Sequence, residues 1–75
     1  MTQLNQSAAE LDYAEAAQLF QGGHLPLAEA RLKRWLDADI PDARIHALAG
    51  FIRLKAGHAD GAIAALTRAL SLIHI

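Results

Sequence analysis

The sequence contains no cysteine among its 75 residues, so neither a disulfide nor a zinc site with cysteine ligands can stabilise the fold. It also lacks an excess of either charge, because seven basic and eight acidic residues give a formal net charge of −1. Proteins that bind nucleic acid or acidic membranes by general electrostatic attraction usually carry a strong basic excess. The charge balance therefore argues against both kinds of partner.

Two further absences concern targeting and membranes. The N-terminal stretch MTQLNQSAAE lacks the basic start and apolar core of a signal peptide. No apolar run in the sequence approaches the roughly 20 residues that span a bilayer. We therefore expect a cytoplasmic protein that does not enter the membrane.

Aromatic residues are also scarce, at 5%, whereas hydrophobic residues make up 53% and include many alanines. Alanine favours helices that pack at close range. A chain of this length buries only ~60% of the surface that it exposes when unfolded, so we expect one small domain of modest stability. We place this domain at residues 8–75, after an N-terminal tail and helix cap at residues 1–7.

Glycine marks the end of the first expected helix and a capping box marks its start. Ser7 and Glu10 match the capping box, in which each side chain bonds the backbone N–H of the other residue. The helix then covers about residues 8–21. Gly22 and Gly23 end it, because glycine readily takes the left-handed conformation found after helices.

Proline marks the next two helices. Pro26 suits the first turn of a second helix, where its missing N–H costs nothing. Pro41 is expected to open a third helix, with Asp39 or Ile40 near its cap. No alternating pattern of a β-strand competes with this interpretation, so the sequence predicts an all-α fold.

Apolar residues recur at helical spacing in all four expected helices. The third helix is expected to end at Ala56 and Gly57, and the fourth to begin near Ala59. The apolar stripes are Leu11, Ala14 and Gln18 beside Tyr13, Ala16, Ala17 and Phe20 in the first helix; Leu25, Ala28, Leu32, Trp35 and Leu36 in the second; Ile45, Leu48, Ala49 and Ile52 in the third; and Ala62, Ile63, Leu66, Ala69, Leu70 and Ile73 in the fourth.

The two halves of the sequence match when one is shifted by 34 residues, without a gap. The matched pairs are Ala9 and Ala43, Leu11 and Ile45, Ala16 and Gly50, Gly23 and Gly57, His24 and His58, Ala28 and Ala62, Ala30 and Ala64, Leu32 and Leu66, Arg34 and Arg68, and Leu36 and Leu70. A helix–turn–helix unit therefore occurs twice, over about residues 9–41 and 43–75.

This period, the turn glycine and the small-x-x-x-large pattern of each second helix resemble the tetratricopeptide repeat family. The pattern is Ala28 with Leu32 in one unit and Ala62 with Leu66 in the other. The resemblance implies two antiparallel helix–turn–helix hairpins stacked as a short α-solenoid.

The sequence departs from the family at several positions. The usual tryptophan of each unit is replaced by Asp12 and His46, and Trp35 stands where a small residue is usual. The proline that closes a unit is displaced to Pro41 in the first unit and is missing from the second.

The resemblance also implies a concave groove, lined by the first helix of each unit, that holds a peptide or helix of a partner. The matching positions are Glu10, Tyr13, Ala17, Phe20 and Gln21 in the first unit and Arg44, Ala47, Phe51, Leu54 and Lys55 in the second. The positions that grip a terminal carboxylate in one subgroup of the family are mostly apolar here, so we expect an apolar helix or strand instead. The alternative is that these residues only pack between the helices.

The last helix is apolar where repeat arrays usually carry a polar cap. Leu70, Ile73 and Ile75 supply this character. We expect either that the chain is part of a longer array or that it self-associates through this helix.

Motifs for catalysis, metals and cofactors are missing. The four histidines show no metal-ligand spacing, and His24 and His58 recur as turn residues of the repeat. No serine lies in a nucleophile elbow, and the glycine pair at positions 22–23 is not followed by the lysine of a phosphate loop. We therefore expect a non-catalytic protein that needs no cofactor.

One basic cluster suggests another partner. Arg31, Lys33 and Arg34 adjoin Trp35, a combination that can supply charge and base stacking. Acidic neighbours favour a solvated helix face instead. The sequence thus predicts a protein–protein interaction module, with an N-terminal appendage of a larger enzyme and RNA binding as the alternatives.

Overall fold

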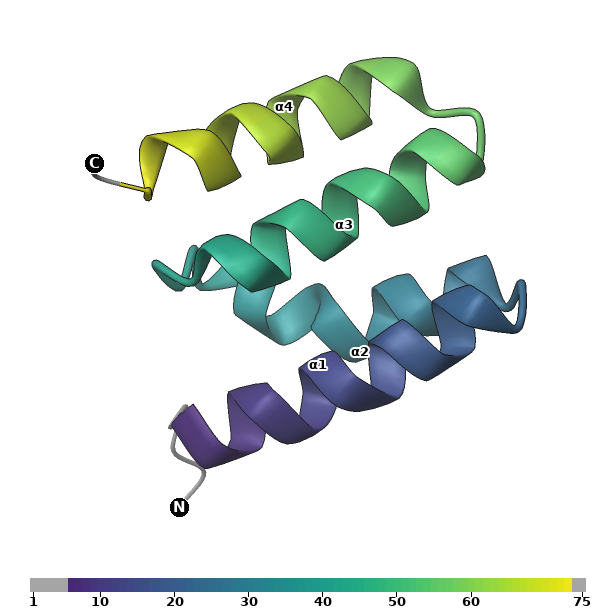
Figure 1. The fold of residues 1–75 in the computed structure, drawn as a ribbon, viewed down its shortest axis with the longest axis horizontal. Coiled ribbons are helices and arrows are strands. Elements are labelled where there is room, and N and C mark those ends of the chain that lie inside the picture. The colour runs from purple at the N-terminus through teal and green to yellow at the C-terminus, as the bar shows by residue number, and fades with distance from the viewer. Residues whose placement is uncertain (1–5, 74–75) are drawn as a thin grey trace.

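The computed structural model describes residues 6–73, which form four helices joined by short turns (Figure 1). The helices are α1 (Gln6–Gln21), α2 (Leu25–Asp37), α3 (Ala43–Lys55) and α4 (Ala59–Ser71). α1 and α2 form one antiparallel hairpin, α3 and α4 form a second, and α3 packs on both helices of the first. The predicted all-α fold of two packed helical hairpins is confirmed.

The two hairpins repeat the same backbone geometry. α4 begins and ends 34 residues after α2. Gly23 and Gly57, which follow α1 and α3, have φ angles of 83° and 87°, a left-handed conformation that glycine adopts without strain. In both turns the next residue donates its backbone N–H to a carbonyl five residues earlier, at 2.8 Å, as in a Schellman cap. The sequence repeat is therefore also a structural repeat.

The predicted helix boundaries need two corrections. The turns after α1 and α3 lie where the sequence predicts them, and Pro26 is in the first turn of α2. However, α1 begins at Gln6, so Ser7 lies inside the helix and does not mark its start. Pro41 lies before α3, whose N-cap is Asp42. A carboxylate is favoured there because it accepts from the free N–H groups of the first turn.

The core consists largely of small and medium side chains at the contacts between helices. Trp35, Leu32, Ile45 and Ile52 are the largest fully buried side chains. The other buried hydrophobic residues are Ala9, Ala16, Ala28, Leu48, Ala49, Ala62, Ala65 and Ala69. Because the distance between packed helices depends on the side chains at their contact, these alanines allow a close approach.

Of the two stripes predicted for α1, only one faces the core. Ala16 is fully buried, and Tyr13, Ala17 and Phe20 are partly buried against the core, as predicted. The other stripe is wrong, because Leu11 is 62% exposed, and Ala14 and Gln18 are exposed as well. Asp12 is buried, which the apolar pattern did not predict.

A buried polar contact joins α1 to α2. The Trp35 indole N–H donates to Asp12 Oδ2 at 2.7 Å, and Arg34 Nε donates to the same oxygen at 3.1 Å. A buried indole requires such an acceptor. The first unit therefore has its tryptophan on the second helix, and Asp12, at the position where the family usually has tryptophan, satisfies its N–H.

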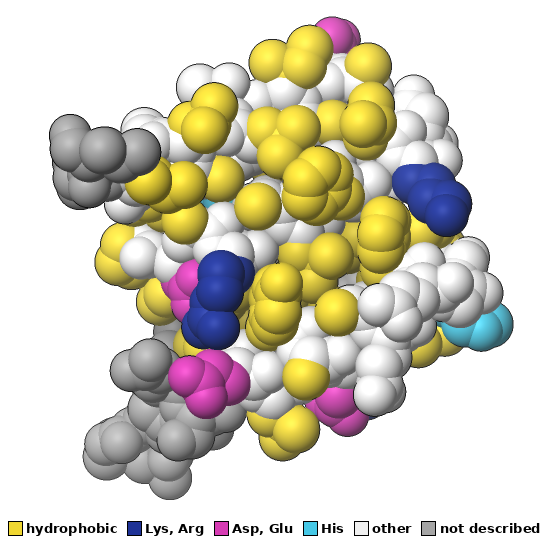
Figure 2. Space-filling model, in the orientation of Figure 1, with side chains coloured by type: hydrophobic (Ala, Val, Ile, Leu, Met, Phe, Trp, Pro, Cys, Tyr) yellow, Lys and Arg dark blue, Asp and Glu magenta, His cyan; other side chains and the backbone are white. Residues whose placement is uncertain are grey.

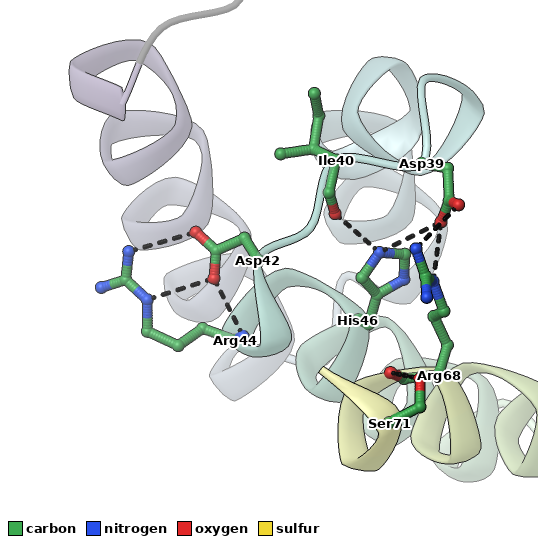
Figure 3. Close-up of polar contacts among 7 residues, drawn as sticks. All are labelled: Asp39, Ile40, Asp42, Arg44, His46, Arg68 and Ser71. Carbon is green, nitrogen blue, oxygen red and sulfur yellow. Dashed lines mark hydrogen bonds and ion pairs between the residues drawn. The ribbon is translucent and has the colours of Figure 1, made fainter. Parts of the chain in front are cut away.

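The second hairpin uses an acid from the loop between the units (Figure 3). His46 takes the position of Asp12, and its Nε2 lies 2.9 Å from the Ile40 carbonyl oxygen. Arg68 donates from Nε and Nη2 to the two carboxylate oxygens of Asp39, at 3.0 and 2.9 Å. Asp39 has a φ of 50°, which is uncommon for a residue other than glycine. These contacts bind the loop between α2 and α3 to α3 and α4.

α3 and α4 are in close contact at Gly50. A Cβ atom placed there would lie 2.5 Å from Leu66 Cγ and 3.3 Å from the Ala62 carbonyl oxygen. A side chain at this position would therefore displace Leu66. The matching residue of the first hairpin, Ala16, does carry a Cβ, so the second hairpin is packed more tightly here.

We predict that Gly50→Ala destabilises the protein by about 1–2 kcal/mol, because overpacking outweighs the gain of about 1 kcal/mol in helix propensity. In a Leu66→Ala background the same change should be stabilising, since the added methyl group then has room. Urea unfolding of the four proteins measures both effects. A stabilising Gly50→Ala in the unaltered background would contradict the close approach.

Candidate functional site

The residues predicted to bind a partner lie on one face, which we call the α1–α3 face. Its members are Tyr13, Ala17 and Phe20 from α1 and Arg44, Ala47, Phe51, Leu54 and Lys55 from α3. Their spacing places each set on one side of its helix, and the two helices are in contact. The structure therefore brings the predicted residues together.

Two basic side chains of α3 lie over aromatic rings of α1. The guanidinium carbon of Arg44 is 5.3 Å from the Tyr13 ring centre, and Lys55 Nζ is 5.4 Å from the Phe20 ring centre. A cation within about 6 Å of an aromatic face is attracted to it. These contacts tie α1 to α3 near both ends of α3.

The charge of Arg44 is balanced by acids. Asp42 Oδ1 accepts from the backbone N–H of Arg44 at 3.0 Å, and Oδ2 lies 3.3 Å from Arg44 Nη2 (Figure 3). Burial raises the pKa of the Asp42 carboxyl, but the hydrogen bonds and charge of Arg44 together outweigh burial and hold this pKa below its ordinary value of 3.8. The hydrogen bond with Asp42, with further attraction to Asp42 and Glu10, raises the pKa of Arg44 in turn.

The charge of Lys55 is not paired with an acidic side chain of the described residues. No carboxylate within residues 8–73 forms an ion pair with its ammonium group. Its neighbours on α3, Phe51 and Leu54, are 49% and 56% exposed. The C-terminal half of α3 therefore presents two large apolar side chains beside an uncompensated positive charge.

Apolar side chains extend beyond the α1–α3 face. Figure 2 shows hydrophobic side chains gathered across the surface that α1, α3 and α4 present together, with Lys or Arg side chains at either end. Contiguous apolar surface of this kind is typical of interaction sites.

The basic residues of α2 form ion pairs within the fold. Trp35 is 1% exposed, so its ring is not available for stacking on a base. Each basic residue faces a carboxylate: the pairs are Arg31–Glu15 at 3.8 Å, Lys33–Asp37 at 3.0 Å and Arg34–Asp12 at 3.0 Å. The combination of charge and stacking that suggested RNA binding is therefore not present at this cluster.

Two of the three residues predicted for self-association are exposed, Leu70 on α4 and Ile73 just after it. Leu70 is 71% and Ile73 51% exposed, whereas Ile75 lies outside the described residues. Ile63 is 63% exposed and lies two turns before Leu70, on the same side of the helix. Sequence reasoning did not include Ile63 in this surface. A comparison with Glu29, its match in the first unit, would have drawn attention to it.

The histidines within residues 6–73 belong to no group that could bind a metal ion. Among the residues that the structure describes, no group of three or more His, Asp or Glu side chains could hold a metal ion. His24 and His58 are exposed and precede α2 and α4 without capping them through their side chains. None of the described helices is long and apolar enough to cross a membrane.

No protein-family model, curated protein or solved structure matches this chain. The case for a function therefore rests on the chain's own surfaces.

We predict that Asp42→Ala lowers the free energy of unfolding by about 1 kcal/mol through loss of the cap, whereas Asp42→Asn, which keeps an acceptor oxygen, costs much less. Because the folded-state pKa of Asp42 is lowered, its ionisation stabilises the fold fully above the ordinary pKa of 3.8 and is lost as the pH falls through the folded-state value. Urea unfolding on both sides of this pH range should show a smaller acid-induced loss for Asp42→Asn. An equal loss in both proteins would exclude a role for this carboxylate.

Proposed function

We propose that this protein is a non-catalytic protein–protein interaction module of the tetratricopeptide repeat family, acting in the cytoplasm, and that its α1–α3 face binds an apolar helix or extended segment of a partner. The observation that carries the proposal is the exposure of Phe51 and Leu54 beside Lys55. Helix faces with large exposed apolar residues are a common means of recognising peptides.

The charges of the face indicate what should flank the apolar segment. Arg44 already has Asp42 and Glu10 as acidic neighbours, whereas Lys55 has no ion-pair partner within residues 8–73. A carboxylate of the partner gains most beside Lys55, because Coulomb attraction there is not offset by a neighbouring acid. We therefore propose a ligand with large apolar side chains and an acidic residue at the Lys55 end.

The proposal of family membership is supported by the equivalence of the two units. Both turns use a left-handed glycine, and α2 and α4 coincide under a shift of 34 residues. This period and the helix–turn–helix unit are those of the tetratricopeptide repeat. The family's tryptophan positions remain departures, at Asp12 and His46.

A displayed library of random peptides, selected on the immobilised protein, tests the proposed ligand. We expect the selected peptides to combine bulky apolar residues with acidic ones. Phe51→Glu together with Tyr13→Glu should weaken their binding by about thirtyfold or more, as expected for loss of a central apolar contact. Leu27→Glu is the matched control, because Leu27 is 58% exposed and lies on α2. Binding that survives the double change in a folded protein would refute the proposed site.

A second experiment compares the contributions of Lys55 and Arg44 to peptide binding. Lys55→Gln should weaken the binding of an acidic peptide by about threefold, in line with an exposed ion pair, and the effect should fade in high salt. Arg44→Gln should have a smaller effect because Asp42 already neutralises Arg44. Fluorescence anisotropy with a labelled peptide measures both. A larger effect of Arg44→Gln would show that the assignment of charges is wrong.

A further inference from the structure

The outer side of α4 is the structural counterpart of a covered surface on α2. In the first unit, Leu32 is fully buried and Leu36 is partly buried against the core, and α2 packs on both α1 and α3. Their matches in the second unit differ: Leu66 is half-buried beside Gly50 of α3, whereas Leu70 is 71% exposed. α4 therefore presents, uncovered, a surface that α2 uses to hold a helix like α3.

Under the 34-residue shift, the outer side of α1 corresponds to the side of α3 that packs on α2. Ile45 on α3 is fully buried, whereas its match on α1, Leu11, is 62% exposed. Ile52 is 1% exposed, whereas its match, Gln18, is exposed. Each side of the α2–α3 interface thus has a counterpart on the molecular surface. The outer side of α4 corresponds to that of α2, and the outer side of α1 corresponds to that of α3.

One contacting pair of charged residues in the α2–α3 interface is replaced by apolar residues at the matching positions of α4 and α1. Across the internal interface, Arg53 Nε donates to Glu29 Oε1 at 2.9 Å, which forms an ion pair. The match of Glu29 on α4 is Ile63, and the match of Arg53 on α1 is Leu19. Both partners of the ion pair are therefore replaced by apolar residues. In a copy of the same interface formed by α4 and α1, Ile63 would meet Leu19.

We propose that two copies of this chain associate head to tail, with the outer side of α4 in one copy covered by the outer side of α1 in the next, in the arrangement that α2 and α3 have within the chain. Because the two contacting surfaces differ, a dimer keeps one free surface of each kind, so association can continue beyond two copies. Gln18 and Glu15 make the α1 surface more polar than that of α3, so we expect micromolar affinity.

Sedimentation velocity from the low micromolar to the millimolar range tests the proposal. The average mass of the unaltered protein should rise past that of a dimer as the concentration increases. Ile63→Glu and Leu11→Glu, on opposite contacting surfaces, should each weaken association by about tenfold or more. Leu54→Glu is the matched control: Leu54 is 56% exposed on the α1–α3 face, so its change should leave association intact. A mass that stays at one chain, or stops at two, would overturn the proposal.

A complementation experiment distinguishes this arrangement from others. Ile63→Glu and Leu19→Arg each create a mismatch with an unaltered copy of the other residue, so each variant alone should associate at least about tenfold more weakly than the unaltered protein. In an equal mixture, the glutamate of the Ile63→Glu variant meets the arginine of the Leu19→Arg variant, which restores an ion pair like that of the internal interface. At the next contact, Ile63 of the second variant meets Leu19 of the first, as in the unaltered protein. The mixture should therefore associate again. Failure of the mixture, with both variants folded by circular dichroism, would reject the head-to-tail register. If Leu19→Arg does not fold, association that survives Leu11→Glu would reject it instead.

Discussion

The structure depends on how closely the two helices of each hairpin can approach. With few aromatic residues and no cysteine, the chain can neither build a large core nor cross-link a small one. Alanine at most buried positions and glycine at position 50 bring the backbones together, and Leu66 fills the space that Gly50 leaves. This packing joins α4 to α3, the helix that carries five of the eight residues of the α1–α3 face.

In the two units, the arginine of the second helix is bound by a carboxylate from a different element of the structure. In the first, Asp12 on α1 accepts from Trp35 and Arg34 on α2. In the second, a histidine replaces this acid, and Asp39 in the preceding loop binds the arginine of α4. An arginine at one repeat position thus needs a carboxylate nearby, but the carboxylate need not come from the same element. A repeat preserves geometry more strictly than it preserves individual contacts.

The sequence predicted the parts of this fold that depend on local chemistry. Turn glycines and the repeat period gave four helices and their pairing, because both act over a few residues or recur at a fixed distance. For α1 the sequence predicted two apolar stripes, of which only the one with Ala16 is buried, and it did not predict the burial of Asp12, which depends on the contact with Trp35. The balance of Arg44 by Asp42 also required coordinates, because the sequence alone had assigned the α3 cap to the wrong residue.

We propose that the arrangement of α2 and α3, which joins the two units within a chain, is repeated by α4 of one chain and α1 of the next. The absence of cysteine permits a direct test, because single cysteines can be introduced without a competing thiol. Ile63→Cys and Leu19→Cys proteins, mixed and treated with a short bis-maleimide cross-linker, should give a heterodimer in preference to either homodimer. Efficient cross-linking of Ile63→Cys to itself, or none in the mixture, would contradict the claim.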